Sequence, residues 1–210
     1  MSDEGLTVLG TASAAETSTA IAVVVSSLTL FAIHGIHLAT LPFPLWNLLV
    51  PPLVWVVADL LSGLVHWTAD TWGSETTAVI GPRFIRPFCV HHLNAQDIVS
   101  RPFLHLNSDV ALGVLPILIA AFFVPDRGRF FLVMLALGIL PTNQIHQWAH
   151  HPDPPPFARM LQRLGLILRP EDHLLHHTAP NRSHFCITTG WCNRFVGPFL
   201  TGVEERIRRQ

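Results

Sequence analysis

The chain has 210 residues, half of them hydrophobic and only 13% of them charged, so it forms one domain or at most two and has the composition of an integral membrane protein. Its 13 basic and 14 acidic residues almost cancel, which argues against the positive field that recruits nucleic acids, so no nucleic-acid partner is expected. The three cysteines are too few and too irregularly spaced for a disulfide framework.

The N-terminal half begins with a polar tail and two apolar runs. Residues 1–18 are acidic and small and lack the positive stretch of a secretory signal, so we expect a disordered cytosolic tail followed by a single membrane-embedded domain over 19–210. The run 19–38 is long enough, at about 1.5 Å per residue, to cross a hydrocarbon core of roughly 30 Å. A second run over 51–67 opens with two prolines, which suit the first turn of a helix.

Two shorter apolar runs, 110–124 and 130–145, predict a helical hairpin. Residues 125–129 between them contain proline, glycine and charged side chains, which is typical of a turn. Pro116 and Pro141 are expected to kink the two arms, as a helical bundle tolerates. The fold class is therefore an all-α integral membrane protein with about four transmembrane helices.

The segment 157–168 alternates apolar residues with Arg and Gln at helical spacing and predicts a helix lying in the membrane interface. Arginine placement orients the spans. The connection 39–49 has none, whereas three lie between the second and third spans and eight lie C-terminal to the fourth. The positive-inside rule then places both termini and the long middle loop in the cytosol. All basic residues are arginine, a bias typical of a GC-rich bacterial source, so the expected location is a bacterial inner membrane.

Nine of the 13 histidines fall into four tight groups near the predicted cytosolic ends of the spans. Because positions i and i+4 share a helix face, each group with that spacing can present two ligand atoms to one metal. The groups are His66 with Asp70, His91 with His92, His146 with His150 and His151, and His173 with His177, where His176 adds a third ligand at i+3. Segments distant in sequence can therefore form a histidine-rich cytosolic cap.

The number of candidate ligands points to two metal ions. Eight imidazoles and one carboxylate exceed a four-ligand zinc site, and nitrogen with carboxylate donors suits iron, zinc, copper or manganese. Two iron ions with dioxygen as co-substrate are expected, because paired iron can remove hydrogen from an unactivated carbon. The predicted metal ligands, which are also the predicted catalytic residues, are His66, Asp70, His91, His92, His146, His150, His173, His176 and His177.

The other histidines have plainer interpretations. We expect His34 and His37 to be packing or interfacial residues, because they lie toward the outer end of the first span. His151 follows His150 and points off the shared helix face, so we take it as a spectator. The sequence leaves His105 and His184 undecided.

Further polar residues lie inside the predicted spans. Asp59 precedes His66 by seven residues on the same helix face, and an ionisable residue at that depth is a functional candidate. It either orients a ligand histidine from behind or bonds a neighbouring helix. Asn143 and Gln144 precede His146 and are open to the same two interpretations.

Four segments also resemble the lipid desaturase family of plasmanylethanolamine desaturases, the CarF/Kua group. They are DLLSGLVHWTADTWGS (59–74), GPRFIRPFCVHH (81–92), TNQIHQWAH (142–150) and HLLHHTAP with FCITTGWCN (173–193). The resemblance covers roughly residues 50 to 200 and is specific, since several long motifs recur in order. It implies a membrane enzyme that uses iron and dioxygen to insert a double bond into a lipid chain, with the nine predicted ligands on its functional positions.

Two positions depart from the plasmanyl pattern, which has histidine where this chain has Arg101 and Asn181. The related plastid branch, which desaturates an acyl chain of phosphatidylglycerol, also lacks histidine there. The resemblance therefore implies desaturation and leaves open whether the substrate is an ether lipid, giving a vinyl ether, or an acyl lipid.

The reaction needs electrons, and no flavin or haem motif is present in the sequence. An external donor of the ferredoxin or cytochrome b5 type is therefore expected beside the membrane lipid substrate. Two alternatives remain: a lipid hydroxylase with the same two irons, and a non-catalytic, metal-binding regulatory membrane protein. A zinc hydrolase is disfavoured, because the sequence has no HExxH motif.

Overall fold

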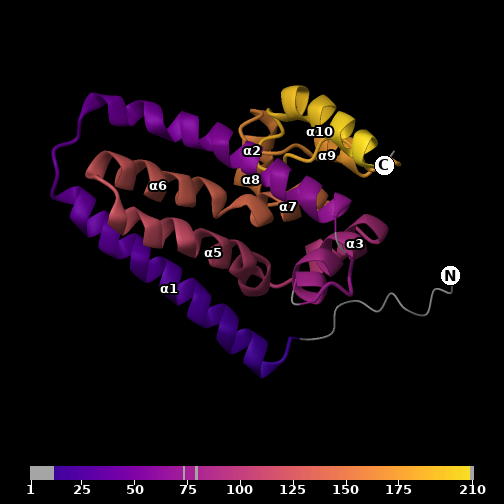
Figure 1. The fold of residues 1–210 in the computed structure, drawn as a ribbon, viewed down its shortest axis with the longest axis horizontal. Coiled ribbons are helices and arrows are strands. Elements are labelled where there is room, and N and C mark those ends of the chain that lie inside the picture. Colours follow the sequence, from indigo (N-terminus) through magenta and orange to yellow (C-terminus); the bar gives the residue numbers. More distant parts are fainter. Residues whose placement is uncertain (1–11, 73, 79, 209–210) are drawn as a thin grey trace. The chain divides into compact units, whose positions relative to one another are not determined.

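The protein is described by a computed structural model that covers residues 12–72, 74–78 and 80–208. All regular elements in these ranges are helices (Figure 1), which confirms the all-α prediction. They are α1 (Ala14–Ala39), η2 (Leu45–Leu49), α2 (Val50–Thr71), the π-helix η3 (Gly81–Ile85), α3 (Arg86–Leu93), α4 (Gln96–Ser100), α5 (Phe103–Ala120), η4 (Ala121–Phe123), α6 (Asp126–Ile139), α7 (Thr142–His150), α8 (Pro156–Arg163), α9 (Pro170–His176) and α10 (Asn193–Arg208).

Four helical stretches are long and apolar enough to cross a membrane, as predicted: Ala14–Ala39, Leu45–Thr71, Phe103–Phe123 and Asp126–His150. The last of these is interrupted at Leu140 and Pro141, where α6 ends and α7 begins. Proline lacks the N–H that would continue the helix, so Pro141 divides the fourth stretch instead of only kinking it.

Two sequence predictions need correction. The tail was expected to reach residue 18, but α1 begins at Ala14. A capping box explains this start: Ser13 N–H donates to Glu16 Oε2 at 2.7 Å, and Glu16 N–H donates to Ser13 Oγ at 3.2 Å. Residues 1–11 of the tail lie outside the described residues. The turn expected over 125–129 is shorter than predicted and lies at Val124 and Pro125. α6 begins directly after Pro125 with Asp126 in its first turn, where the helix dipole favours a negative charge.

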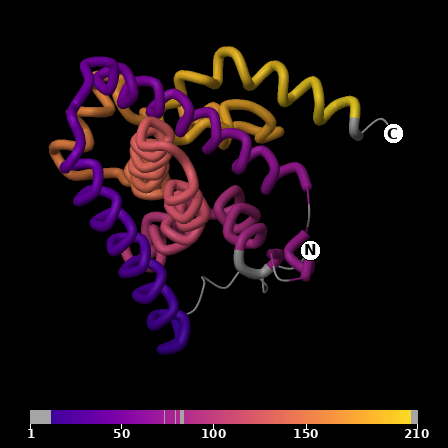
Figure 2. Tube along the Cα trace, turned by 60° about the vertical axis from the view of Figure 1, so that its left-hand side comes forward, coloured from indigo at the N-terminus to yellow at the C-terminus, as the bar shows by residue number. Residues whose placement is uncertain are grey.

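The described chain divides into two compact units, which are considered separately. The apolar unit comprises residues 12–58 and 102–144, and the histidine unit comprises residues 59–101 and 145–208. In the apolar unit, α1, α5 and α6 pack against one another, and their courses can be followed in both views (Figure 1 and Figure 2). Their core is formed by Val114, Leu118, Ala121, Val133 and Ala136.

Several polar side chains of the apolar unit form polar contacts with neighbouring helices. The buried His34 donates from Nε2 to Leu118 O at 2.8 Å, which confirms its packing role. His37 lies 2.8 Å from Asp126 at an exposed position. Asn143 and Gln144 bond a neighbouring helix, which was one of their two interpretations. Asn143 Nδ2 donates to Leu106 O at 2.9 Å, and Gln144 Oε1 accepts from Asn107 at 3.2 Å.

The histidine unit combines the C-terminal part of α2 with six short elements and α10. Trp67, Phe185 and Leu200 form a small core that joins α2, the segment before α10 and α10 itself. The helix predicted over 157–168 is shorter than expected. It is α8, which ends before Gly165, a residue with φ of +66° that favours glycine.

Candidate metal centre

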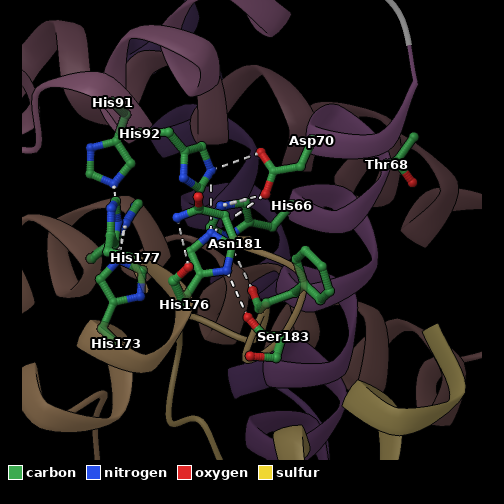
Figure 3. A network of polar contacts seen from close by, with 12 residues as sticks. His66, Thr68, Asp70, His91, His92, His173, His176, His177, Asn181 and Ser183 are labelled. Atoms are coloured by element: carbon green, nitrogen blue, oxygen red, sulfur yellow. Dashed lines mark hydrogen bonds and ion pairs between the residues drawn. The ribbon is translucent and has the colours of Figure 1, made fainter. Parts of the chain in front are cut away.

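The nine predicted ligands form two groups of converging side chains, and all of them lie in the histidine unit. In each group the candidate ligand atoms lie within 4.8 Å of one another. The five-histidine group consists of His91, His146, His150, His173 and His177. The Asp70 group consists of His66, Asp70, His92 and His176 (Figure 3).

The i, i+4 pairs remain together as the spacing predicted: His66 with Asp70, His146 with His150, and His173 with His177. The expectation for His176 is wrong, since it belongs to the Asp70 group and not with His173 and His177. The neighbours His91 and His92 also separate, one into each group. Successive residues of a helix point about 100° apart, so adjacent histidines face different groups.

The two groups adjoin. The ring centroids of His173 and His176 are 5.6 Å apart, and those of His92 and His177 are 5.1 Å apart. Most of these side chains are buried, and His66 and His176 have no exposed surface. The arrangement can therefore hold two ions close together in a space largely shielded from water.

Two histidines of the Asp70 group are oriented by backbone carbonyls. Nδ1 of His66 donates to Phe185 O at 3.1 Å, and Nδ1 of His176 donates to Ser183 O at 2.7 Å (Figure 3). A carbonyl only accepts, so Nδ1 carries the proton and Nε2 keeps a free lone pair. Both Nε2 atoms face Asp70 Oδ2, at 3.4 and 3.5 Å. This is how metal-binding histidines are usually held.

Several buried polar atoms of both groups lack a hydrogen-bond partner. They include Nε2 of His66 and of His150 and Oδ2 of Asp70. Unpaired buried polar atoms are costly in a folded protein and call for an explanation. Other ring nitrogens crowd together, as do the Nε2 atoms of His146 and His173 at 2.8 Å. A cation among these lone pairs would satisfy them, so the residues fit a metal centre.

Burial keeps several of the histidines neutral, as metal ligands must be. It lowers the pKa of His91 and His173, with neighbouring imidazoles adding to the effect. Burial, with His92 as the next cause, lowers the pKa of His176 to about 3 and that of His177 to about 4. These side chains can offer lone pairs at neutral pH without first losing a proton.

A pocket of about 170 Å³ opens beside the Asp70 group. Its lining includes Asp70 and His92 together with Cys89, Asn181, Arg182 and Glu204. Arg182 forms an ion pair at 3.2 Å with the buried Glu204 of α10. Among the candidate ligands, the pocket is lined by members of the Asp70 group alone.

Asp59 lies away from the two ligand groups. Within the described residues, its hydrogen-bond partners include no ligand histidine. Its carboxylate accepts the backbone N–H groups of Thr188, Thr189, Gly190 and Cys192. Sequence reasoning singled out Asp59 by its depth but missed this partner, because backbone donors leave no pattern in the sequence.

The remaining singled-out residues lie outside the two groups. Arg101 pairs with the buried Asp97 at 2.6 Å, and Asn181 donates from Nδ2 to His176 O at 3.0 Å. His151 Nδ1 accepts the backbone N–H of Asp153, as expected of a spectator.

The two undecided histidines are also not among the converging ligands. His105 Nε2 lies 3.4 Å from Thr17 Oγ1. His184, with φ of +58°, lies 3.0 Å from Ser183 Oγ through Nδ1. Neither therefore adds a donor to the two groups where the plasmanyl pattern has histidine at Arg101 and Asn181.

Comparison with known proteins finds a matching family model and several similar proteins. Residues 55–207 match a family model described as a lipid desaturase domain. The chain is 40% identical to a plasmanylethanolamine desaturase of Myxococcus xanthus over 156 residues, which cover 71% of this chain and 56% of that protein. It is 40% identical to plasmanylethanolamine desaturase 1 of Mus musculus over 150 residues, which cover 66% and 55% of the two chains.

A plastid relative is also similar. The chloroplastic fatty acid desaturase 4 of Arabidopsis thaliana is 36% identical over 146 residues, which cover 66% of this chain and 44% of that protein. The chain thus spans about half the length of the curated relatives that it matches. No solved structure matches it.

Proposed function

Because the chain belongs to the lipid desaturase family, we propose that it is a membrane desaturase that uses two iron ions and dioxygen to introduce a double bond into a lipid alkyl or acyl chain. The observation that carries this proposal is the pair of adjoining ligand groups, each with its donor atoms within 4.8 Å. Five neutral histidines in one group and three histidines with Asp70 in the other suit two ions with nitrogen-rich coordination.

The overall reaction fixes what the protein must be supplied with. Two hydrogen atoms leave adjacent carbons, dioxygen is reduced to two water molecules, and two electrons and two protons come from outside. Bound iron would supply the activation of dioxygen needed to attack an unreactive C–H bond. The electrons are assigned to an external donor of the ferredoxin or cytochrome b5 type.

The residues of the chain have distinct tasks in this proposal. The Nε2 atoms of His66 and His176 bind metal, while their Nδ1–H groups stay on backbone carbonyls and fix the rings. Asp70 is the one carboxylate of the two groups and offsets part of the metal charge. The buried walls limit water, which keeps an oxidising centre from reacting with solvent.

The substrate class follows from the relatives only in part. The names of two relatives specify plasmanylethanolamine and that of the third a fatty acid. Arg101 and Asn181, the two positions that depart from the plasmanyl pattern, have different surroundings. Arg101 pairs with Asp97, whereas Asn181 donates to the carbonyl of His176 and lines the pocket beside the Asp70 group. A vinyl ether and an acyl double bond are both products that this centre can form.

We place the protein in a bacterial inner membrane with the metal centre on the cytosolic side. Four apolar helices support a membrane location, and the arginine distribution supports the orientation. The same orientation would put the centre within reach of a cytosolic electron donor.

The test is lipid analysis of a bacterium that lacks plasmalogens and expresses the chain. We expect lipids lighter by two hydrogens, with about two irons per purified chain, and the shifted species identifies the substrate. His176→Ala should abolish the change while the protein still inserts. His37→Ala, which alters only an exposed contact with Asp126, should keep full activity.

The same measurement separates the alternatives. Products heavier by one oxygen would identify a hydroxylase. Unchanged lipids from a chain that binds iron, even when a reduced ferredoxin is supplied to the membranes, would favour the non-catalytic metal-binding protein. Full activity of His176→Ala would remove this histidine from the site.

A further inference from the structure

The segment 183–192 carries both carbonyls that orient the histidines of the Asp70 group. Ser183 O receives the Nδ1–H of His176 and Phe185 O receives that of His66. Residues 184–187 belong to no helix or turn, so no internal ladder of hydrogen bonds fixes where the Phe185 carbonyl lies. Its position depends on the element against which the segment packs.

A buried carboxylate of α2 binds the far end of this segment. Asp59 Oδ1 accepts the N–H groups of Thr188, Thr189 and Gly190 at 3.2, 2.7 and 2.9 Å, and Oδ2 accepts that of Cys192 at 2.9 Å. Asp59 has no exposed surface. Burying a carboxylate is costly unless donors surround it, and hydrogen bonds to an ionised acceptor are strong and well directed. The four bonds therefore stabilise one course of the segment.

The next turn of α2 continues this contact toward the histidines. Ser62 Oγ accepts the N–H of Ile187 at 3.0 Å. Gly63 lies against Cys186 so closely that a Cβ would be 2.4 Å from the Cys186 Sγ. Both residues share the helix face of Asp59. One face of α2 thus contacts the segment from residue 192 back to residue 186, and the side chain of Asn193 adds two hydrogen bonds to the backbone of Cys186.

We infer that Asp59 is a positioning residue for the Asp70 group. Its carboxylate fixes the course of segment 183–192, and the segment's two carbonyls hold the rings of His66 and His176 with Nε2 toward the metal position. The inference rests on the proposed function in taking this group as a metal site. In the part of the chain that the structure describes, none of the five-histidine group is hydrogen-bonded to this segment.

The first experiment follows the segment itself, in metal-free protein. Cys186 and Cys192 are buried, and burial raises the pKa of both thiols, that of Cys192 to about 11, so both should react slowly with iodoacetamide at pH 7.5. In Asp59→Ala, four N–H groups lose their acceptor, and alkylation of both thiols should rise about tenfold or more relative to Cys89. Unchanged alkylation would overturn the inference.

The second experiment uses cobalt(II) as a probe metal and measures, from its absorption spectrum, how many ions bind and how tightly. Asp59→Ala should retain the ion of the five-histidine group and bind the ion of the Asp70 group about 10- to 100-fold more weakly, the usual loss when an orienting partner is removed. Asp59→Asn keeps an oxygen acceptor and should give a smaller loss. Gly63→Ala leaves Asp59 intact but pushes the segment away, and should reproduce the selective loss.

Two matched variants control for general damage. Asp97→Asn removes another buried carboxylate of the histidine unit, one that pairs with Arg101 and not with segment 183–192. Gly113→Ala adds a methyl group at a helical glycine with nothing within 4 Å. Both should bind two cobalt ions with the affinity and spectrum of the parent chain.

The outcomes separate this inference from the proposed function. A released segment with two ions bound as in the parent would overturn the role of Asp59, because the carbonyls would then not be needed. Equal weakening of both ions would also overturn it in favour of general damage. A parent chain that binds no cobalt would overturn the proposed function and the metal role of Asp59 together, whatever the alkylation result.

Discussion

His150 and His151 are neighbours with different surroundings. His150 belongs to the five-histidine group, and its buried Nε2 has no hydrogen-bond partner. His151 lies beyond the end of α7 and accepts a backbone N–H through Nδ1. The spacing from His146 separated these two roles from sequence alone, because only His150 stands at i+4.

The pair provides a matched test of the five-histidine group. We expect His150→Ala to lower desaturation by about 100-fold or more, since a ligand should cost at least as much as its orienting partners do. His151→Ala should stay within about twofold, because His151 lies outside both ligand groups and its hydrogen bond to Asp153 is local. Lipid turnover and iron content of both variants check this. Equal losses of activity in the two variants would contradict the assignment of His150 as a ligand and His151 as a spectator.

Buried neutral histidines also give the metal-free protein a pH dependence. His176, with its pKa lowered to about 3, takes up no proton near pH 5.5 in the folded chain. In the unfolded chain the same side chain titrates near 6.5. The unfolded state therefore binds more protons below pH 6.5, and stability falls as pH falls through the window from 6.5 toward 3.

We expect the metal-free protein to lose about 1 kcal/mol of stability at pH 5.5 from His176 alone, with further losses from His91 and His173, whose pKa values are also lowered. Thermal unfolding in detergent at pH 7.5 and 5.5 measures this. The drop should shrink in His176→Ala. A metal-free protein that is equally stable at both pH values would contradict the neutral, buried state of these histidines.

At the scale of elements, α8 has three distinct faces. Ala158 and Gln162 are buried, Arg159 and Arg163 are exposed, and a third face exposes large apolar side chains. This apolar face consists of Phe157, Met160 and Leu164 at spacings of three and four residues. An exposed apolar stripe beside an arginine stripe is the pattern of a helix lying in a membrane interface.

Spin labels can test this placement of α8. A label at Met160→Cys should be more accessible to oxygen, which concentrates in the acyl region. A label at Arg163→Cys should be more accessible to a water-soluble nickel complex, because arginine side chains of such helices face the headgroups. Electron paramagnetic resonance of protein in vesicles gives both accessibilities. Two labels with the same aqueous exposure would show that α8 lies off the membrane.

The same scale explains where helix prediction succeeded and failed. The start of α6 was misplaced because charged residues after Pro125 suggest a turn, whereas Asp126 suits the first turn of a helix. The sequence did not predict that His176 belongs to the Asp70 group, because α9 is so short that both of its sides face ligand groups. If α9 had only one buried face, His173, His176 and His177 would all belong to one ligand group.

For the whole molecule, the number of membrane-crossing stretches could be read from the sequence because about 20 consecutive apolar residues have few other uses. The convergence of the nine side chains could be predicted in part, because three pairs among them have the i, i+4 spacing of one helix face. Their division into two groups could not, since it depends on how α3, α7 and α9 pack. The hydrogen bonds of Asp59 could not be predicted either, because its partners are backbone groups about 130 residues away.

The orientation of the chain is a prediction for the whole molecule. Pro42 and Thr76 are exposed in connections on either side of α2, and the positive-inside rule assigns them to opposite sides of the membrane. A membrane-impermeant maleimide should label Pro42→Cys in intact cells and Thr76→Cys only after lysis, above the background of the parent chain. The reverse pattern would place the metal centre outside the cytosol.

The adjacent pairs His91–His92 and His176–His177 each contribute one side chain to either ligand group. In each pair, a single peptide bond therefore links a residue of one ligand group to a residue of the other. Inserting or deleting a single residue next to either pair would turn both rings by about 100° and take a donor from each half at once. We conclude that this centre can accept exchanges of side chains around it far more readily than any change in chain length at these two places.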